Sequence, residues 1–361
     1  MRVIVVGAGA VGSFVGWAVA AGGGSTTVVR RSTAAPGGIE RLAAVRPDGV
    51  RTTVEVEVVP AVPAVPAIPA GPAGGFAGSV DAPDLVIVAV KQYDLAAAVD
   101  SLAHRPAVPV LTVQNGVGAE EAALAARPAA PLLAGSLTAS VERRADGSLG
   151  WLRTGGLGLA PVQGNVLDVT AALARTLRAA GVPVAILESA PAMKWSKLVG
   201  NLVGNATSGL LDLDPAEIYA DPRLFEVERR QLLEALAVMR AMGLRPIRLP
   251  GANMPLLARA LRLPTLLARA ALRRVVGGAR GGKDPSLRAA VDGGGRTEVG
   301  WLNGAVVRAG RDNGIATPVN AALTALVEEA AGDRDRRAWF RGRPDRLLEA
   351  LGDPPARGEG P

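Results

Sequence analysis

The sequence contains no cysteine and only one histidine, His104, among its 361 residues. The absence of cysteine excludes disulfides, cysteine nucleophiles and thiolate metal sites. A single histidine argues equally against a histidine-based metal site and against a serine–histidine–aspartate triad. We therefore predict no metal centre, and we expect any catalytic proton donor to be a lysine, a tyrosine or a carboxylic acid.

Aromatic residues are also scarce, at 3%, although hydrophobic residues make up 49% of the chain. The cores must therefore consist of alanine, valine and leucine, and the length favours two domains over one. The net charge is +7, but the arginines are dispersed and are not interleaved with aromatic residues. An anionic small ligand explains this charge better than nucleic acid, so no nucleic-acid partner is expected.

Long uninterrupted apolar runs are lacking as well. Residues 1–23 are apolar, but their regular glycines fit a strand, a turn and a helix better than a signal peptide. Residues 256–283 are amphipathic and basic. A helix with this pattern could lie on a membrane surface, but the pattern is more typical of a core helix with one solvated face. We expect a cytoplasmic protein with no membrane partner.

A glycine-rich loop, GAGAVG, lies between a β-branched strand at residues 2–6 and an apolar helix. Its spacing fits the G-x-G-x-x-G pattern of a dinucleotide-binding turn. Gly7 permits the tight turn, Gly9 lets a pyrophosphate approach the backbone, and Gly12 lets the helix pack closely. The phosphates would lie at the amino terminus of the helix, which favours anions. The predicted phosphate-binding loop consists of Gly7, Ala8, Gly9, Ala10, Val11 and Gly12.

The next predicted strand, residues 26–32, carries Arg30 and Arg31 near its end. An NAD site would normally have an acidic residue there to bind the ribose hydroxyls, whereas a guanidinium suits the 2′-phosphate of NADP. Arginines are common in this chain, so their presence alone indicates little. The position of these two at the end of the second strand is what favours NADP over NAD. We predict NADPH as the cofactor, with Arg30 and Arg31 as binding residues.

Two continuous apolar runs follow, one ending at Lys91 and the other at Asn115, as expected for buried parallel strands. In doubly wound sheets, ligands bind beyond the carboxyl ends of the strands. Considered alone, Lys91 would be a solvated lysine and Asn115 a turn residue. Their occurrence at the same sheet edge as the glycine loop favours a role for both in the site.

A run of prolines and alanines occupies much of residues 54–79. Proline cannot donate to a sheet ladder, so the run cannot be a central strand. We predict an edge strand that continues as a loop, and we assign it no function.

Strand patterns stop near residue 190, and helical patterns follow one another from there. The sequence therefore predicts an α/β chain in three parts. Residues 1–189 form a Rossmann-type doubly wound domain, residues 190–332 an all-helical domain, and residues 333–361 a charged, partly disordered tail with one short helix. The active site is expected between the two domains.

The segment KWSKLVGNLVGN begins the helical half. Lys197, Asn201 and Asn205 are spaced four residues apart, so on one helix they form a single stripe suited to a small polar anion. Gly200 and Gly204 beside this stripe cost about 1 kcal/mol each in a helix, which the close approach of a backbone or ligand would offset. An ordinary polar face is the alternative, but such faces in this chain use arginine and glutamate.

A last polar cluster lies between residues 283 and 304. Ser286 falls near a predicted helix start, and Glu298 falls in the first turn of the next helix. Both residues are candidates for the site, and both are also credible as helix-capping residues.

Taken in order, several motifs resemble the ketopantoate reductase (2-dehydropantoate 2-reductase) family over roughly residues 2–330. They are GAGAVG, Arg31, VAVKQYD, VQNGVG, KWSKLVGNLVGN and RTEVGWLNG…NGIATP. The resemblance implies reduction of the C2 ketone of ketopantoate by NADPH to give (R)-pantoate, a step toward pantothenate and coenzyme A. It also implies a helical domain like that of the 6-phosphogluconate dehydrogenase superfamily.

The resemblance assigns the proton donor to Lys197 and leaves Lys194 unassigned. Glu298 matches the glutamate that supports both the substrate hydroxyl and this lysine. The assignment agrees with simple chemistry, because hydride delivery leaves negative charge on oxygen and a nearby cation stabilises it. Among the binding residues of the family, Lys91 and Asn115 match groups placed against the nicotinamide and the substrate.

Three residues match substrate-binding residues of the family: Asn201, Asn205 and Ser286. Three others depart from the family pattern: Gly300, Ala290 and Lys283. Gly300 stands where the family has an aspartate, and Lys283 stands where it has an asparagine. Ala290 stands where the family has an acidic residue, for which Asp292 could substitute. These departures leave open another 2-oxo acid or an imine as substrate. A non-catalytic NADP(H) sensor is a further alternative, but it would not need the lysine–asparagine stripe. A homodimer is the assembly considered, although the sequence does not fix it.

Overall fold

The computed structural model describes residues 1–30, 37–61, 83–105, 107–279 and 286–352. The chain divides into two compact units. The first unit contains residues 1–114 and 119–190, and the second contains residues 115–118 and 191–361. Arg31 and Lys283 lie outside the described residues.

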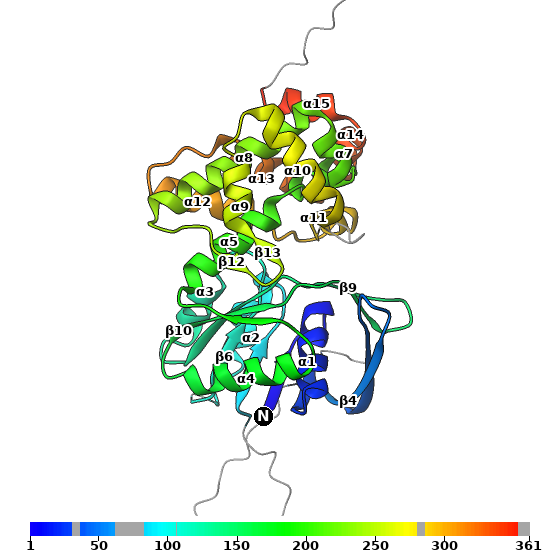
Figure 1. Cartoon of the computed structure of the whole chain (residues 1–361), viewed down its shortest axis with the longest axis vertical. Helices are drawn as coiled ribbons and strands as arrows, with labels where there is room; N and C mark the ends of the chain where they lie inside the picture. Colours follow the sequence, from blue (N-terminus) through cyan, green and yellow to red (C-terminus); the bar gives the residue numbers. More distant parts are fainter. Residues whose placement is uncertain (31–36, 62–82, 106, 280–285, 353–361) are drawn as a thin grey trace, which may run out of the picture. The chain divides into compact units, whose positions relative to one another are not determined.

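A large mixed sheet forms the centre of the first unit (Figure 1). In the described residues its strand order is β11-β10-β7-β6-β5-β1-β2-β4-β3-β9-β8. The central strands β6, β5, β1 and β2 are parallel, as in a Rossmann-type sheet. The strands are β1 (Arg2–Val6), β2 (Ser25–Val29), β3 (Gly38–Val45), β4 (Arg51–Val59), β5 (Leu85–Val88), β6 (Val110–Thr112), β7 (Leu132–Leu137), β8 (Ser140–Arg143), β9 (Leu149–Arg153), β10 (Leu157–Gln163) and β11 (Val184–Ile186).

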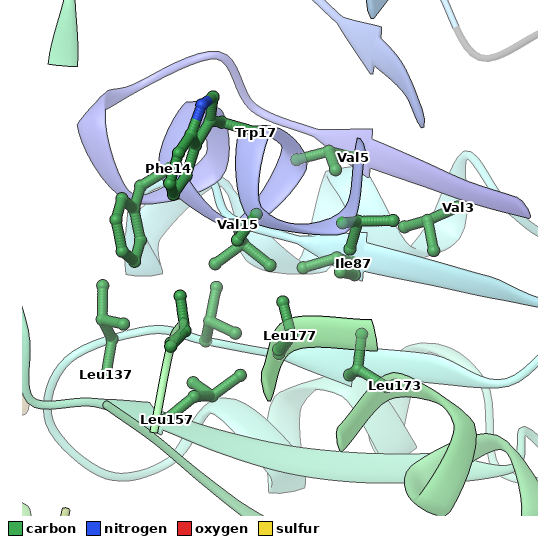
Figure 2. Close-up of a cluster of buried hydrophobic side chains, with 14 of the residues drawn as sticks. Val3, Val5, Phe14, Val15, Trp17, Ile87, Leu137, Leu157, Leu173 and Leu177 are labelled. Atoms are coloured by element: carbon green, nitrogen blue, oxygen red, sulfur yellow. The ribbon is translucent and has the colours of Figure 1, made fainter. Parts of the chain in front are cut away.

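Helices cover both faces of this sheet, which explains why its central strands are continuously apolar. Helices α1 (Ala10–Ala21) and α4 (Leu167–Ala179) pack on one face. Figure 2 shows Phe14, Trp17 and Leu177 of these helices in one cluster with side chains of the strands. Helices α2 (Leu95–Asp100) and α3 (Ala119–Ala126) cover the other face. The predicted α/β class is confirmed.

The strand that precedes the proline-rich run was predicted as an edge strand, and this prediction is wrong. Strand β4 pairs with β2 on one side and with β3 on the other, so it lies inside the sheet. The strand can be internal because it ends at Val59, before the first proline of the run, Pro60. No proline therefore interrupts its ladder. Residues 62–79 of the run lie outside the described part of the chain.

The second unit is helical in its described residues, apart from a small hairpin of β12 (Arg248–Leu249) and β13 (Ala252–Asn253). The long helix α8 packs against α7, α12 and α13. The helices are α5 (Ala190–Leu202), α6 (Ala206–Leu211), α7 (Pro215–Ala220), α8 (Pro222–Ala241), α9 (Met254–Ala260), α10 (Thr265–Ala279), α11 (Ser286–Asp292), α12 (Asn303–Asp312), α13 (Pro318–Gly332), α14 (Arg334–Phe340) and α15 (Pro344–Ala350). The predicted all-helical domain is confirmed.

Residues 333–352 were expected to be a charged tail with one short helix, but the structure forms two helices there, α14 and α15. Phe340 and Leu347 are fully buried in the second unit. Arginines stack on the aromatic ring of Trp339 nearby. The charged composition therefore conceals a few apolar positions that attach this segment to the helical unit.

Candidate active site

The glycine loop of the first unit has three distinct backbone environments. Gly7 adopts a φ of 111°, and a Cβ there would lie 2.8 Å from the carbonyl carbon of Ala89. A Cβ on Gly12 would lie 1.9 Å from the Gly7 oxygen, so the helix and the turn are in close contact. Around Gly9, in contrast, a Cβ would meet nothing within 4 Å. This arrangement is the one a dinucleotide-binding turn requires.

Helix α1 begins within this glycine motif, at Ala10. Gly9 is the N-cap residue and makes no side-chain cap hydrogen bond to the first turn. The first N–H groups of the helix and its macrodipole therefore favour an anion at this end. The Ala8 carbonyl accepts hydrogen bonds from Ser13 Oγ at 3.2 Å and from Arg143 Nη2 at 3.1 Å. Arg143 also hydrogen-bonds to Ser13, so these side chains fix the shape of the loop.

A pocket of about 450 Å³ adjoins the glycine loop. It lies on the α1 side of the sheet, since Val28, Val56 and Val58 of its lining belong to the core beneath α1. Burial lowers the pKa of the Arg143 guanidinium, and the charge of Arg30 lowers it further. The charged residues in the lining are Arg30, Glu40, Arg41, Arg51, Arg143 and Asp146. Four cations face two carboxylates, so the pocket suits an anion.

Lys91 lies in the first unit, beyond the carboxyl end of β5. The predicted strand was too long, because β5 ends at Val88 and Lys91 is the exposed N-cap of a short 3₁₀ helix at Gln92–Asp94. The turn between them is held by Gln114, whose amide donates to the carbonyls of Val88 and Val90 at 2.9 and 3.1 Å. Lys91 thus follows the carboxyl end of a parallel strand, as the sequence predicts, and this strand is the neighbour of β1.

In the second unit, KWSKLVGNLVGN is not one helix, contrary to the prediction. Helix α5 ends at Leu202, and α6 begins at Ala206. Gly204 adopts a φ of 56°, and its N–H donates to Glu228 Oε2 at 2.7 Å. The stripe therefore holds for Lys197 and Asn201, which share α5, but not for Asn205, which lies in the break between the helices.

The backbone requires glycine at Gly204 but not at Gly200. Gly204 needs a left-handed backbone, and a Cβ there would also lie 3.0 Å from Pro215 Cβ. A Cβ on Gly200 would meet Met254 at 3.4 Å, which is an ordinary contact. The expected close approach of another backbone at Gly200 is therefore not seen in the described residues.

Glu228 is the residue that the break between α5 and α6 depends on. Its side chain is fully buried, and besides the Gly204 N–H it accepts from Thr207 Oγ1, Tyr219 OH and Gln231 Nε2 at 2.7–3.0 Å. The sequence analysis did not identify it. A signal was present, because Glu228 lies four residues from the fully buried Leu224 and Leu232 on α8, and a carboxylate in such a stripe needs buried partners.

The break directs the Asn205 side chain to the start of α11. Asn205 is 3% exposed, its Oδ1 accepts from the Leu287 N–H at 3.2 Å, and its Nδ2 lies 3.4 Å from Ser286 Oγ. Arg288 holds α11 in place through Asp212, with an Nε to Oδ1 distance of 2.6 Å. Two of the predicted binding residues, Asn205 and Ser286, are therefore in contact.

A second group of predicted residues meets where residues 115–118 contact the helical unit. Asn201 Nδ2 donates to Asn115 Oδ1 at 3.3 Å, and the Val117 N–H donates to the Trp301 carbonyl at 3.3 Å. Gly116 has a φ of 85°, and a Cβ there would lie 2.3 Å from the Trp301 oxygen. Trp301 ends the short 3₁₀ helix η2 (Val299–Trp301), whose N-cap is the buried Glu298.

The two lysines of α5 differ in exposure. Lys194 is 3% exposed, whereas Lys197 is partly exposed, so Lys197 is the one that a ligand can reach more easily. Asp292, considered as a substitute for a missing acidic residue, is paired with Arg337 of α14. That ion pair makes it a poor candidate for a substrate contact.

Comparison with known proteins decides the family. The family model described as ketopantoate reductase PanE/ApbA matches residues 3–164, and the model for its C-terminal part matches residues 190–331. The chain belongs to the ketopantoate reductase family. Within this family, the 2-dehydropantoate 2-reductase of Halobacterium salinarum is 30% identical over 92% of the chain and 100% of its own length. That of Archaeoglobus fulgidus is 27% identical over 68% and 75% of the two chains.

Solved structures agree with the family assignment. A PanE/ApbA family ketopantoate reductase from Ralstonia eutropha superposes with a TM-score of 0.69 at 25% identity, covering 94% of this chain and 100% of that one. D-mandelate dehydrogenase, in a ternary structure with NADH and anilino(oxo)acetate, gives the same TM-score at 19% identity over 92% and 98% of the two chains. The second match shows a shared fold alone.

The family assignment confirms that the chain is an oxidoreductase of the class that acts on a CH–OH group with a pyridine nucleotide. Within the described residues, no helix is both long and apolar enough to cross a membrane. The same part of the chain holds no group of three or more metal-ligating side chains. The roles of the individual site residues remain predictions.

Proposed function

We propose that this ketopantoate reductase family member reduces ketopantoate (2-dehydropantoate) to (R)-pantoate with NADPH, in the cytoplasm, as a step toward pantothenate and coenzyme A. The observation that carries the proposal is the pairing of predicted polar groups from separate segments, Asn201 with Asn115 and Asn205 with Ser286. The similarity to the 2-dehydropantoate 2-reductases of Halobacterium salinarum and Archaeoglobus fulgidus supports the same substrate.

The residues of the glycine loop fit a dinucleotide, because the backbone at Gly9 is open and the amino terminus of α1 carries no side-chain cap. In this proposal the loop, Gly7 to Gly12, holds the pyrophosphate. Arg30 lines the adjoining cationic pocket, where it would bind the 2′-phosphate together with Arg31. Lys91 would lie against the nicotinamide end. When bound, the nicotinamide supplies the hydride.

In the proposed mechanism, Lys197 donates the proton to the ketone oxygen. Negative charge develops there as the C2–H bond forms, and an ammonium within hydrogen-bond distance stabilises it. The position of Lys197 on α5, one turn from Asn201, supports this role. Glu298, buried at the start of η2, would support the substrate hydroxyl and the lysine.

The amides complete the proposed substrate site. Asn201 and Asn205 each offer an N–H₂ group, and Ser286 offers a hydroxyl. Such neutral donors can bind a carboxylate or a hydroxyl group without adding a second cation beside Lys197. The fixed contacts of Asn205 with α11 pre-organise this part of the site before the substrate binds.

A second candidate substrate is another 2-oxo acid. Gly300 offers no side chain where the family pattern has an aspartate, and Asp292 is committed to Arg337. The chain therefore has fewer acidic side chains that could contact the hydroxyl end of ketopantoate.

The test is NADPH consumption by the purified chain with ketopantoate and with a panel of other 2-oxo acids, with identification of the product. We expect (R)-pantoate to form and ketopantoate to give the highest kcat/KM. A higher kcat/KM for another member of the panel would favour the second candidate, and no turnover with any of them would refute the enzyme proposal.

A further inference from the structure

The lining of the pocket beside the glycine loop contains an ion pair between Arg30 and Glu40. Arg30 follows directly after β2, and Glu40 lies on β3. Their contact is bidentate, with Nη1 to Oε1 at 2.8 Å and Nη2 to Oε2 at 2.9 Å. Both side chains line the same pocket as Ala8 of the glycine loop. The pair thus occupies the region where the ribose of a bound dinucleotide would begin.

The bidentate pair occupies the edge of the guanidinium formed by Nη1 and Nη2, one of the edges through which arginine can bind a phosphate. A phosphate is bound best by two parallel N–H groups of one arginine, which is the geometry that Glu40 already satisfies. A carboxylate at this position also repels a 2′-phosphate. An unphosphorylated ribose, in contrast, can donate its hydroxyls to a carboxylate.

The other arginines of the pocket are bound differently. Arg41 approaches Glu55 at 3.7 Å and Arg51 approaches Asp146 at 3.6 Å, in exposed single contacts. Arg143 is bonded to the loop itself. Among the ion pairs in the described lining of the pocket, Arg30–Glu40 therefore has the shortest distances and the bidentate geometry.

We propose that Glu40 is a specificity-determining residue that competes with the 2′-phosphate of NADPH for Arg30, and so lowers the preference for NADPH over NADH. The inference rests on the proposed use of a dinucleotide at the glycine loop. It extends that proposal, because it assigns to this chain a built-in counterion that moderates the cofactor selectivity predicted from Arg30 and Arg31.

The experiment is to measure Kd for NADPH and for NADH in the full chain by titration, in wild type and in Glu40→Gln, with no keto acid present. Both side chains of the pair are more than one-third exposed, so the effect is moderate. We expect the substitution to raise the NADPH-to-NADH affinity ratio by about three- to fivefold. The matched control is Glu57→Gln, since Glu57 is exposed on β4, accepts from the Thr27 hydroxyl and does not line the pocket. The control should leave the ratio unchanged.

A double-mutant cycle with Arg30→Ala tests whether Glu40 acts through Arg30. We expect Glu40→Gln to have a clearly smaller effect on the ratio in the Arg30→Ala background, where only the direct effect of the carboxylate on the ribose remains. An unchanged or lower ratio in Glu40→Gln, or an undiminished effect without Arg30, would overturn the inference. Thermal unfolding of each variant shows whether the fold is kept, and Glu40→Gln alone suffices if Arg30→Ala is unstable. Because the readout is nucleotide binding, the inference stands if the ratio shifts while ketopantoate is not reduced. It fails together with the proposed function if wild type binds neither nucleotide.

Discussion

The two units assemble their candidate sites in different ways. In the first unit, the six consecutive residues Gly7 to Gly12, which form the turn after β1 and the first three positions of α1, would hold the nucleotide. In the second unit, the polar groups come from residues 115–118, from α5, from the break before α6, from the start of α11 and from η2. The first site is a property of local backbone geometry, whereas the second depends on how helices pack.

This difference predicts how each site responds to mutation. The shape of the loop follows from glycine at Gly7 and Gly12, with contacts within a few residues and at β5. The position of Asn205 follows from Glu228, which is 23 residues further along the chain and meets the break only through the fold. Substitutions in the helices of the second unit should therefore alter substrate use and leave nucleotide binding intact.

Lys197→Ala should have the largest effect. Loss of the ammonium removes stabilisation of the developing oxyanion, so we expect kcat to fall by about 10²- to 10³-fold. Nucleotide Kd should change by less than about twofold, because the glycine loop belongs to the other unit. The matched control is Lys194→Met, which removes the neighbouring buried ammonium and keeps an apolar stem. Steady-state kinetics that show equal losses in both variants would contradict the assignment of Lys197.

Replacing Glu228 should have the next largest effect. In Glu228→Leu, the Gly204 N–H and the Thr207 and Tyr219 hydroxyls lose their acceptor inside the core, so the free energy of unfolding should fall by about 3 kcal/mol. The KM for ketopantoate should rise while nucleotide Kd is unchanged. Denaturant unfolding and kinetics measure both.

A matched control for Glu228 is available on the same helix. Glu226 is 40% exposed and pairs with Arg229, so Glu226→Gln should change stability by less than about 0.5 kcal/mol. If Glu228→Leu behaves like this control, the buried carboxylate does not hold the break between α5 and α6.

Asp212 provides a smaller, pH-dependent test. Burial alone would raise the pKa of its carboxyl, but hydrogen bonds and charges from Arg288 and Arg341 outweigh burial and lower the pKa. The folded pKa is then below the unfolded value of about 4, so this stabilisation is complete above pH ~4 and is lost as the pH falls through the folded pKa. Asp212→Asn should cost about 1–2 kcal/mol at pH 7, and the difference from wild type should shrink below pH ~4.

The control for Asp212 is Asp214→Asn. Asp214 contacts the same Arg288, but its side chain is 66% exposed, and asparagine caps a helix as well as aspartate does. It should cost less than about 0.5 kcal/mol at either pH. Denaturant unfolding at pH 7 and pH 3 measures both variants. A pH-independent loss in Asp212→Asn would mean that packing, and not the carboxylate, stabilises this corner.

The parts of the fold that sequence could predict are those that local rules determine. The Rossmann-type sheet followed from apolar strands and the glycine loop, and the helical half followed from capping residues and periodicity. The sequence assigned Asn115 and Asn201 to one site, but it did not predict the hydrogen bond between them. Their hydrogen bond depends on Gly116 fitting against Trp301, which no local pattern encodes.

The errors share one physical cause, a contact with another segment that the local pattern does not encode. Helical spacing placed Asn205 on the stripe of Lys197, but Glu228 captures the Gly204 N–H and ends α5 early. Strand β4 was expected at an edge, but it pairs with β2 on one side and with β3 on the other. Arg30 was considered only as a phosphate ligand, because nothing in the sequence near it indicates that Glu40 pairs with it.

The measurement that tests the central claim most directly compares two substrates that differ in one group. Ketopantoate and 3,3-dimethyl-2-oxobutanoate have the same ketone and carboxylate, but the second compound lacks the terminal hydroxyl. A site built to hydrogen-bond that hydroxyl should prefer ketopantoate by at least about 10²-fold in kcat/KM with NADPH. Equal kcat/KM values for the two compounds would contradict the account, since Glu298 and the amides of the second unit would then recognise no more than a general 2-oxo acid.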